Sequence, residues 1–521
     1  MRLLTTVAAL RCYLGLHRSG EELGFVPTMG ALHEGHLSLI RQACRENDRV
    51  AVSIFVNPLQ FGPNEDLDRY PRTLERDRQL CEQLGVDALF APDVAQMYPD
   101  GAQGTEALTQ VVPPPEMTAV LCGRTRPGHF QGVATVVTKL LNLVRPDRAY
   151  FGQKDAQQLA IIRRLVADLN LPVEIVAGAI VREPSGLALS SRNQYLTPEQ
   201  RQKAAALYRS LRQARIRFEK GDRTRDGILE AIATELESVP ELQIEYVELV
   251  HPDSLMPLKK VETSGLLALA ARIGSTRLID NIVLHNRQPI IAIDGPAGAG
   301  KSTVARQVAR NLGLLYLDTG AMYRAVTWLA LQAGATLDDE PAVAEVLSRC
   351  QLELQPTQDE AVAGCQVKVN GEDVTQAIRT GEVTSNVSTV AAQSAVRQFL
   401  VQQQQNYGSR GGLVAEGRDI GTHVFPHAEL KIFLTASVRE RARRRRQDLE
   451  RQGQNVMSLD RLEQAIAERD RKDRTRVLAP LCKAPEAIEI QTDGLSISDV
   501  IGKIVDCYHE KIAEMPTLSR S

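Results

Sequence analysis

The sequence predicts an α/β protein with parallel sheets, and three observations support this fold class. Short apolar runs alternate with amphipathic stretches over most of the chain, as expected where helices connect buried parallel strands. Two glycine-containing segments, one at Gly30 and one between Gly295 and Gly300, each follow an apolar run and precede a helix-like stretch. The length of 521 residues suits three or four domains of about 150 residues each.

Composition narrows the class of protein. A net charge of −2 gives no global reason to expect nucleic acid or an anionic membrane as a partner. The eight cysteines form no C-x-x-C pair, so we expect reduced thiols, mostly buried as small apolar residues. No apolar stretch approaches the roughly 18 residues of a membrane span. The run from Leu3 to Leu10 ends at Arg11 without a small-residue cleavage site, and we expect a soluble cytoplasmic protein.

The first part of the chain has the pattern of a parallel sheet up to about Val181. The expected strands are apolar runs, at 23–26, 50–56, 86–91, 149–151 and 173–181. Ligands of such sheets bind at the carboxyl ends of strands. Thr28-Met29-Gly30 and Phe151-Gly152-Gln153-Lys154-Asp155 both lie at such ends, so we expect them to face one crevice.

A second domain is predicted to begin near Thr197-Pro198-Glu199-Gln200, which has the capping residues of a helix start. The apolar runs after this helix predict a small sheet, with strands at 244–250, 266–271 and 278–284. The junction His285 to Pro289 is too short for a flexible tether.

A second α/β unit is predicted from Ile290 onward. Its first strand covers 290–294 and its first helix 302–312, with Gly313 as the stop. Between about Cys350 and Thr380 the pattern changes, and Asn370-Gly371 predicts a hairpin in a small antiparallel insert. Strands at 413–415, 430–434 and 488–490 are expected to return to the main sheet.

His33-Glu34-Gly35-His36 is the first candidate site. A helix that starts just after a strand end offers unpaired backbone amides and a positive dipole end to a phosphate. The two imidazoles stand three residues apart, so they point to one face. An imidazole can donate to a phosphoryl oxygen and, when protonated, offset negative charge in a transition state. The alternatives are two surface histidines, or a weak metal site without further ligands.

Four segments together resemble pantothenate synthetase (pantoate:β-alanine ligase), a family of the HxGH nucleotidyl-transfer group. They are Pro27 to His36, Phe55 to Phe61, Phe151 to Asp155 and Leu189 to Asn193, and the resemblance covers roughly residues 1 to 285. It implies a Rossmann-like domain over 1–185 and a small α+β domain over 186–286. It also implies two chemical steps: pantoate attacks the α-phosphate of ATP and expels pyrophosphate, then β-alanine displaces AMP from the acyl-adenylate.

The resemblance also implies residue roles. Catalysis falls to His36, as acid or charge stabiliser, with His33, Lys154 and Arg192. The ATP site is formed by Met29, Gly30, His33, His36, Gly152, Gln153, Lys154, Asp155, Val181, Leu189, Ser190, Ser191 and Arg192. Gln60 and Gln158 are implied to hydrogen-bond pantoate. Cations and paired hydroxyls suit a charged phosphoryl transition state, and neutral glutamines suit a polyhydroxy acid.

Two points stay open for this half. Arg124 to Gly132 is either a loop that covers the site, excluding water from a labile acyl-adenylate, or an ordinary surface loop. The alternative enzyme is another HxGH member, such as an adenylyltransferase acting on a phosphorylated alcohol. Gln60 and Ser190-Ser191-Arg192 argue against that alternative.

Gly295-x-x-x-x-Gly300-Lys301-Ser302 is the second candidate site, with the pattern of a P-loop. Its backbone amides cradle phosphates, its lysine reaches the β- and γ-oxygens, and its Ser302 ligates magnesium. The ATP-binding residues expected are Gly295, Gly298, Gly300, Lys301, Ser302 and Thr303. The alternative, a chance glycine turn before a helix, is disfavoured by the strand before it and the Gly313 stop after it.

A P-loop does not identify the acceptor, but four further segments do. Leu317 to Arg324, Ser388 to Arg397, Glu416 to Asp419 and Glu468 to Arg476 closely resemble bacterial-type cytidylate kinase, over about residues 289 to 515. A P-loop nucleoside-monophosphate kinase domain is implied there, with a monophosphate-binding insert at about 350–410 and a lid at about 439–476. The implied CMP-binding residues are Thr319, Arg324, Ser388, Arg397, Arg418, Asp419, Arg469, Asp473 and Arg476. Thr319 departs from the serine usual in the family, and its methyl group tightens that pocket.

The arginine-rich stretch from Arg439 to Arg446 has the composition of a nucleic-acid patch. We favour a lid helix, in which two or three arginines clamp ATP phosphates and the others are solvated, because consecutive residues point all around a helix.

The whole chain is thus interpreted as a bifunctional enzyme that uses ATP and Mg²⁺ in converting pantoate, β-alanine and CMP. We expect no nucleic-acid or membrane partner, and a homodimer through the ligase half. The alternative from another class is that one half is a catalytically dead nucleotide-binding module regulating the other.

Overall fold

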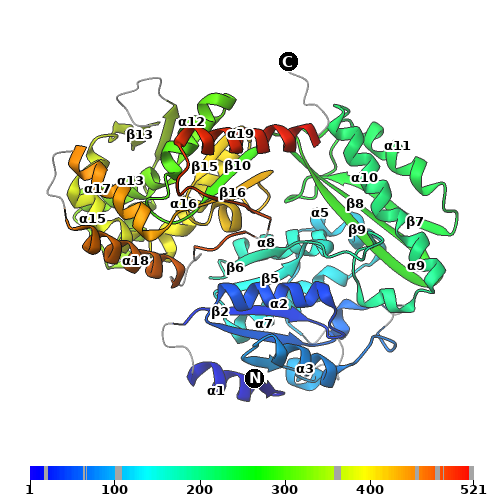
Figure 1. The fold of residues 1–521 in the computed structure, drawn as a ribbon. Helices are drawn as coiled ribbons and strands as arrows, with labels where there is room; N and C mark the ends of the chain where they lie inside the picture. The colour runs from blue at the N-terminus through cyan, green and yellow to red at the C-terminus, as the bar shows by residue number, and fades with distance from the viewer. Residues whose placement is uncertain are drawn as a thin grey trace. The chain divides into compact units, whose positions relative to one another are not determined.

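The structure is a computed structural model that describes residues 1–16, 21–62, 65, 67–99, 108–356, 365–451, 457–475, 481–484 and 486–514. Within helices, the side chains of residues 448, 451, 472–475 and 512–514 are outside the description. The chain divides into two compact units, Met1–Asn286 and Arg287–Thr517 (Figure 1).

The first unit contains a six-stranded parallel sheet in the order β1-β4-β3-β2-β5-β6. Its strands are β1 (Arg2–Leu4), β2 (Leu23–Thr28), β3 (Arg49–Ile54), β4 (Ala88–Phe90), β5 (Arg148–Gly152) and β6 (Glu174–Gly178). From β2 the chain continues to β3 on one side, whereas β5 pairs with β2 on the other. This reversal between β2 and β5 is the topological switch point, where ligands of open α/β sheets bind.

Helices cover both faces of this sheet. All the helices of the first unit, including those that pack on its second sheet, are α1 (Val7–Leu16), α2 (Glu34–Glu46), α3 (Leu74–Gln83), α4 (Val94–Met97), α5 (Pro115–Thr118), α6 (Leu121–Thr125), α7 (His129–Val144), α8 (Ala156–Asp168), α9 (Pro198–Ala204), α10 (Ala206–Glu219) and α11 (Arg225–Leu236), with 3₁₀ turns η1 (Pro58–Gln60), η4 (Gln153–Asp155) and η5 (Ser191–Tyr195) in the described part of the unit. One core joins the sheet to α2 and α3, and another joins it to α1, α7 and α8. The fully apolar strands are thus buried on both faces.

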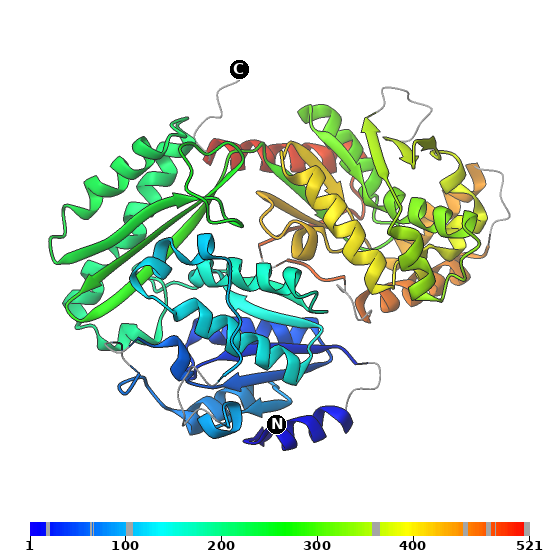
Figure 2. The ribbon, with the colours of Figure 1, turned by 180° about the vertical axis from the view of Figure 1, so that it is seen from behind.

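The first unit also contains a three-stranded antiparallel sheet. Its strands are β7 (Leu242–Val250), β8 (Ser264–Ile273) and β9 (Thr276–His285). Figures 1 and 2 show α10 and α11 stacked on one face of it, where they share an apolar core with its strands. The predicted helix start is confirmed, because Thr197 and Gln200 form a reciprocal capping box at α9.

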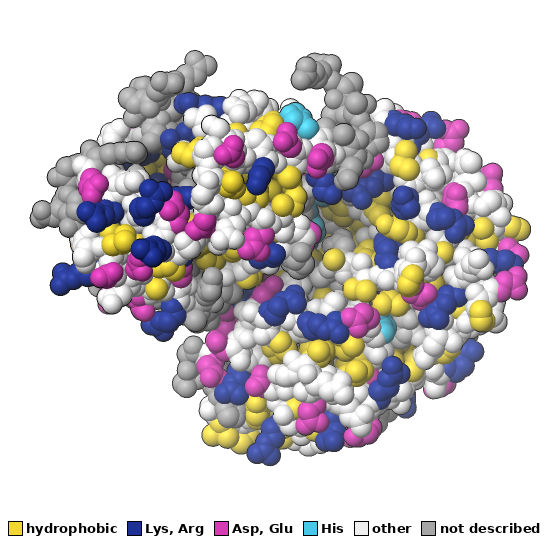
Figure 3. All heavy atoms as spheres, in the orientation of Figure 1, with side chains coloured by type: hydrophobic (Ala, Val, Ile, Leu, Met, Phe, Trp, Pro, Cys, Tyr) yellow, Lys and Arg dark blue, Asp and Glu magenta, His cyan; other side chains and the backbone are white. Residues whose placement is uncertain are grey.

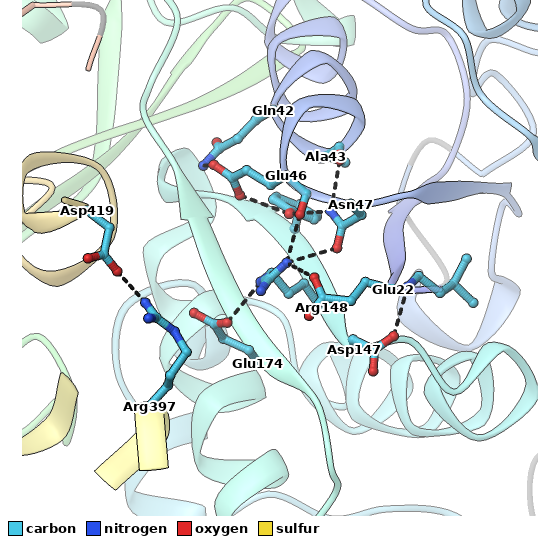
Figure 4. Close-up of polar contacts among 12 residues, drawn as sticks. Glu22, Gln42, Ala43, Glu46, Asn47, Asp147, Arg148, Glu174, Arg397 and Asp419 are labelled. Carbon is cyan, nitrogen blue, oxygen red and sulfur yellow. Dashed lines mark hydrogen bonds and ion pairs between the residues drawn. The ribbon is translucent and has the colours of Figure 1, made fainter. Parts of the chain in front are cut away.

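A buried arginine ties together the amino ends of three strands of the large sheet (Figure 4). The Arg148 guanidinium donates to Glu22 at 2.7 Å, to Glu174 at 3.1 Å and to the Glu46 carbonyl oxygen at 2.8 Å. Its charge is compensated by these carboxylates, so the group stabilises the end of the sheet opposite the switch point.

The second unit contains a five-stranded parallel sheet in the order β11-β15-β10-β16-β17. Its strands are β10 (Ile290–Asp294), β11 (Leu315–Asp318), β15 (Leu413–Glu416), β16 (Leu430–Thr435) and β17 (Ile488–Gln491). The central strand β10 leads directly into the glycine-rich segment. The predicted hairpin at Asn370-Gly371 is confirmed: both residues have positive φ, and they connect β13 (Cys365–Val369) to β14 (Glu372–Asp373) beside β12 (Leu352–Pro356).

Helices again cover both faces of the sheet. Those of the second unit are α12 (Lys301–Leu312), α13 (Thr319–Gln332), α14 (Glu340–Leu347), α15 (Gly381–Val390), α16 (Ser394–Gly408), α17 (Val438–Arg451), α18 (Leu459–Thr475) and α19 (Ile497–Glu514), with turns η6 (Ala377–Arg379) and η7 (Ile420–Val424). One core joins the sheet to α12 and α19, and the other joins it to α13–α16 and the small antiparallel sheet.

The sequence interpretation missed two short strands. The apolar run at Leu3 starts inside β1, which pairs with β4, and β11 has only four residues before α13 begins. The cysteine interpretation holds for Cys81, Cys122 and Cys365, which are buried, but not for Cys12 and Cys482, which are exposed. Across the described ranges, we find no helix with the length and apolarity needed to cross a membrane.

Candidate active sites

The turn between β2 and α2 is held by a buried carboxylate that the sequence interpretation did not identify. Gly30 and Ala31 both have positive φ, 82° and 50°, and the turn is tight. Asp77 of α3 is fully buried and accepts from the amides of Ala31 and Leu32, both at 2.9 Å. Nothing in the sequence around Asp77 predicts this contact across 45 residues.

The two imidazoles close a capping box on the first turn of α2. His33 Nδ1 accepts from the Gly35 amide at 3.2 Å, and His36 Nδ1 accepts from the His33 amide at 3.4 Å. Because both Nδ1 atoms are acceptors, each neutral ring bears its hydrogen on Nε2. The rings lie 4.1 Å apart, so two Nε2–H donors are presented side by side.

Our expectations about this helix end hold only in part. We expected free backbone amides to hold phosphate, but those of Ala31, Leu32, His33 and Gly35 already donate to side chains. For the imidazoles we expected a hydrogen bond to a phosphoryl oxygen and, when protonated, a positive charge. Burial, with the positive charge of Lys154, lowers the pKa of His33 to about 4, and burial beside His33 lowers the pKa of His36 to about 3. Both rings are neutral donors at neutral pH.

Positive charge comes instead from the carboxyl end of β5 and from η5. Lys154 lies in η4 with its Nζ 3.7 Å from an Asp155 oxygen, and Arg192 lies in η5. Desolvation in the cavity favours the neutral form of Asp155, but the positive charges of Lys154 and Arg192 outweigh it and hold the pKa of Asp155 below its usual value. Asp155 is therefore ionised, with Lys154 as its ion-pair partner.

The predicted pantoate residue Gln60 is buried in η1 and orients its amide by two contacts. Its Nε2 lies 2.8 Å from the Met29 sulfur, and its Oε1 accepts from Asn57 at 3.2 Å. Asn57 in turn accepts from the Tyr98 hydroxyl at 3.0 Å. Gln60 is thus a preoriented group next to Met29.

Most of the predicted ligase residues line one cavity of about 220 Å³ at the switch point. Those lining it are Met29, His33, His36, Gln60, Gly152, Lys154, Asp155, Gln158, Val181, Leu189, Ser190, Ser191 and Arg192. Gly30 and Gln153 do not line it; they form the adjacent turns. Tyr70 also lines it and was not predicted; its hydroxyl lies 3.4 Å from the Ser191 oxygen.

A larger cavity of about 440 Å³ shares Lys154, Asp155, Gln158, Ser190 and Arg192 with the first. Its walls include β8 and β9 of the small sheet and the segment that we considered as a cover loop.

The segment from Arg124 to Gly132 is anchored by side-chain contacts and is not a free loop. Arg126 pairs with Glu65 and contacts His129 at 2.9 Å. His129 Nδ1 lies 2.7 Å from the Gln60 carbonyl oxygen. The segment forms a wall beside Gln60.

In the second unit, the segment between β10 and α12 is a tight glycine turn. Gly295, Gly298 and Gly300 have φ of 147°, 78° and 88°. A Cβ at Gly295 would lie 2.0 Å from the Leu434 carbonyl oxygen, so only glycine fits. Lys301 opens α12, and its Nζ donates to the Pro296 carbonyl oxygen at 2.9 Å. The lysine folds back over the turn it belongs to.

Glu416, at the end of β15, is a second carboxylate that the sequence interpretation did not place. Its Oε1 accepts from Ser302 at 2.6 Å and from the Tyr316 hydroxyl at 3.1 Å, and its backbone oxygen accepts from Thr319 at 2.7 Å. Burial, with the nearby Asp318 carboxylate, raises the pKa of Glu416. The β15 end thereby connects the P-loop serine to the predicted acceptor site.

Two predicted CMP-binding residues form a buried ion pair. The Arg397 guanidinium from α16 points at the Asp419 carboxylate (Figure 4). Arg324 of α13 lies 3.4 Å from Asp318, and Arg418 immediately precedes Asp419 after β15. These residues gather around the carboxyl ends of β11 and β15.

The other residues predicted to bind CMP do not lie in this group. Ser388 is exposed on α15 and Arg469 is exposed on α18. Arg476 and the side chain of Asp473 lie outside the described residues.

The arginine-rich stretch forms α17, which pairs with α18 through an apolar cluster. Arg441 is not solvated, contrary to the simplest expectation for such a run. It forms a bidentate pair with Asp470 of α18 and donates to the carbonyl oxygens of Ala436 and, at 3.1 Å, Ala297 in the P-loop. One arginine thus joins both helices of the predicted lid to the phosphate loop.

Comparison with protein families gives two matches along the chain. The family described as pantoate-beta-alanine ligase matches residues 2–283, and the family described as cytidylate kinase matches residues 291–510.

Full-length relatives combine both. A protein named bifunctional pantoate ligase/cytidylate kinase from Nostoc sp. (strain PCC 7120) is 63% identical, over 99% of this chain and 100% of its own. The protein of the same name from Synechocystis sp. (strain PCC 6803) is 57% identical, over 98% of this chain and 99% of its own. The crystal structure of pantothenate synthetase from Thermus thermophilus is similar to the first part, with 51% identity and a TM-score of 0.51, covering 54% of this chain and 99% of that one.

Proposed function

Because the chain belongs to the family of bifunctional pantoate ligases/cytidylate kinases, we propose that its two units perform two separate ATP-dependent reactions with the residues described above. The first unit condenses pantoate with β-alanine to pantothenate through a pantoyl-adenylate, releasing AMP and pyrophosphate. The second unit phosphorylates CMP and dCMP to the diphosphates. ATP is a substrate of both.

In the ligase reaction, the negative charge that builds on the α-phosphate needs fixed donors. His33 and His36 supply two neutral Nε2–H groups, and Lys154 and Arg192 supply two positive charges. Ser190 and Ser191 add hydroxyl donors to the phosphates, and Gln60 and Gln158 hold pantoate so that its carboxylate meets the phosphorus. Asp155, Val181, Leu189, Met29 and the turns at Gly30, Gly152 and Gln153 contact the nucleotide.

The single observation that supports this most strongly is the cavity at the switch point. It brings neutral donors from α2, a lysine from η4, an arginine from η5 and an amide from η1 to one place. Because an acyl-adenylate hydrolyses readily, the site also has to exclude water. The anchored wall of Arg126, His129 and Glu65 beside Gln60 serves that purpose.

In the kinase reaction, Lys301 leaves the Pro296 carbonyl and pairs with the β- and γ-phosphates of ATP, while the turn of Gly295, Gly298 and Gly300 and the first helical residues Ser302 and Thr303 surround the phosphates. The acceptor phosphate and base are bound by Thr319, Arg324, Ser388, Arg397, Arg418, Asp419, Arg469, Asp473 and Arg476. Phosphoryl transfer requires mainly positioning and charge neutralisation, which these arginines provide.

The kinase family implies Mg²⁺. Hard oxygen donors suit this ion, and Ser302 Oγ lies 2.6 Å from the Glu416 carboxylate. Ser302 would hold Mg²⁺, with Glu416 beside it. When bound, Mg²⁺ neutralises charge on the β- and γ-phosphates.

The proposal also covers the domain boundaries, the oligomeric state and the cellular location. We assign 1–185 as the Rossmann-like domain, 186–286 as the small α+β domain and 289–515 as the kinase domain, with the monophosphate insert at about 350–410 and the lid at about 439–476. A cytoplasmic homodimer, joined through the ligase half, acting on small molecules is proposed. Acidic and basic side chains are interspersed over the face drawn in Figure 3, which fits small-molecule substrates better than nucleic acid.

The test uses one preparation of the full chain and two assays. AMP formation is followed with pantoate, β-alanine and ATP, and ADP formation with CMP and ATP. Lys154→Ala should reduce AMP formation by about 10²- to 10³-fold and leave ADP formation unchanged, and Lys301→Ala should do the reverse. If the wild type lacks one activity, that half is a binding module instead.

A further inference from the structure

We infer that Asp280 and Asn281, adjacent on β9 of the small sheet, are positioning residues for the adenylation site, and that Asn281 acts by fixing Lys154. This inference rests on the proposed role of Lys154. It assigns to the small sheet a part in catalysis besides forming a cavity wall.

The amide of Asn281 clamps the turn that contains Lys154. Asn281 is buried, with 3% exposure, and its Nδ2 donates to the carbonyl oxygens of Gln153 at 3.0 Å and Lys154 at 2.9 Å. Its Oδ1 is buried without a partner among the described residues. The amide orientation is therefore set by the two carbonyl groups alone, because only the NH₂ side can donate to them.

The neighbouring Asp280 binds the segment that follows β6. It is 2% exposed, and it binds Arg182 through both oxygens, at 2.6 and 2.9 Å. The Arg182 guanidinium also stacks on the Tyr208 ring at 3.8 Å and donates to the Gly186 carbonyl oxygen at 3.1 Å. Arg182 directly follows Val181, whose carbonyl oxygen accepts from the Leu189 amide at 3.0 Å, next to Ser190.

The strand geometry explains how one dipeptide reaches both segments. Successive side chains of a strand point to opposite sides, so Asn281 is directed to the turn after β5 and Asp280 to the segment after β6. The backbone amide of Asn281 also donates to Asp280 Oδ1 at 2.8 Å, which couples the two contacts. These two segments contribute Lys154 and Asp155, and Ser190 and Arg192, to both cavities. Their spacing is thus set by β9.

The consequence is a catalytic effect of residues that need not touch substrate. Misplacement of a charged group by about 1 Å in a preorganised site can cost about 10²-fold in rate. Asn281→Ala removes both donors to the Lys154 turn, so we expect a 10- to 100-fold lower kcat for pantoate-dependent pyrophosphate release, on the order allowed by such misplacement, with little change in the KM for pantoate.

Asn286→Ala is the matched control. Asn286 also donates from Nδ2 to two carbonyl oxygens, those of Val261 at 3.3 Å and Glu262 at 2.8 Å, but lines neither cavity. It should lose comparable thermal stability and keep the ligase kcat. Activity of the kinase half in the same samples corrects for enzyme concentration.

A double-variant cycle separates positioning from a general structural role. If Asn281 acts through Lys154, then Asn281→Ala added to Lys154→Ala should cause no further loss of kcat. An equal loss in both backgrounds, or a kcat within twofold of wild type for folded Asn281→Ala, would overturn the inference. If Lys154→Ala itself has normal activity, the proposed site is wrong rather than this inference alone.

Discussion

In the proposed function the amino ends of α2 and α12 both bind the phosphates of ATP, and the groups left to donate at the two ends differ. Before α2 the amides of Ala31 and Leu32 are occupied by Asp77, and two imidazoles accept from the amides of His33 and Gly35, so the donors offered outward are Nε2–H groups. At α12 the glycine turn at Gly295 to Gly300 leads into Lys301, and a cation sits in the first turn itself.

The difference teaches where each site places its positive charge. The kinase lysine is local in sequence to its phosphate loop, whereas Lys154 and Arg192 reach α2 from η4 and η5, more than 100 residues later in the chain. A lysine within the phosphate loop is positioned by the conformation of that loop. A lysine from a distant segment needs other contacts to position it, and the turn that holds Lys154 is bound by Asn281 of β9.

The largest effect is expected from Lys301. Lys301→Ala should lower kcat for CMP-dependent ADP formation by about 10³-fold, because the only first-turn cation of α12 is removed from a charged transition state. Steady-state ADP formation measures it, with AMP formation by the same sample as the control. A loss below tenfold would mean that the lid arginines, not the turn, carry the charge.

A paired substitution of His36 tests whether its ring works as a neutral Nε2–H donor. Asparagine places an acceptor where Nδ1 lies, and glutamine places a donor where Nε2 lies. His36→Asn should lose about 10²-fold in AMP formation while keeping the capping bond, and His36→Gln should lose less activity but about 1 kcal/mol of stability. Activity and thermal unfolding are measured on both. The opposite ranking in activity would show that the capping role dominates.

A substitution of Asp77 tests the turn that precedes α2. Asp77→Asn leaves one acceptor for two amides and should cost about 1–3 kcal/mol of stability in the first unit. Ligase activity should fall by about tenfold as the turn at Gly30 and Ala31 shifts. Thermal unfolding with both assays measures this; unchanged ligase activity despite lower stability would remove Asp77 from the site.

The smallest effect concerns pH. With pKa values of about 4 and 3, His33 and His36 stay neutral from pH 8 down to about pH 5, so they should add no step near pH 6.5 to the kcat/KM profile of the ligase. Their folded pKa values lie below the unfolded value, so the stability they contribute is present above about pH 6.5 and is lost as the pH falls toward 4.

Thermal unfolding of the first unit between pH 7 and 4 checks this, with His36→Gln as the comparison. The variant should show a weaker loss of stability with acid. A ligase step near pH 6.5 that disappears in His36→Gln would contradict the neutral assignment.

Much of both sites could be predicted because the informative residues are close in sequence. The P-loop between β10 and α12, the hairpin at Asn370-Gly371 and the capping box at Thr197 are local patterns, and the structure has all three. The ligase residues could be grouped because carboxyl ends of parallel strands meet at one edge. The charge state of His33 and His36 could not, because it depends on burial.

By itself, the sequence determined the alternation of strands and helices, the two glycine-containing turns and the chemical types of the groups around them, since these follow from short-range periodicity and from residues that few other conformations accept. The tertiary structure alone decided which of those groups are free to act. Asp77 binds the amides of the turn before α2, Arg441 is paired with Asp470, and Asn281 binds the Lys154 turn, each across at least 29 residues. A hydrogen bond or a desolvated charge depends on distance and burial, which only the packed chain sets.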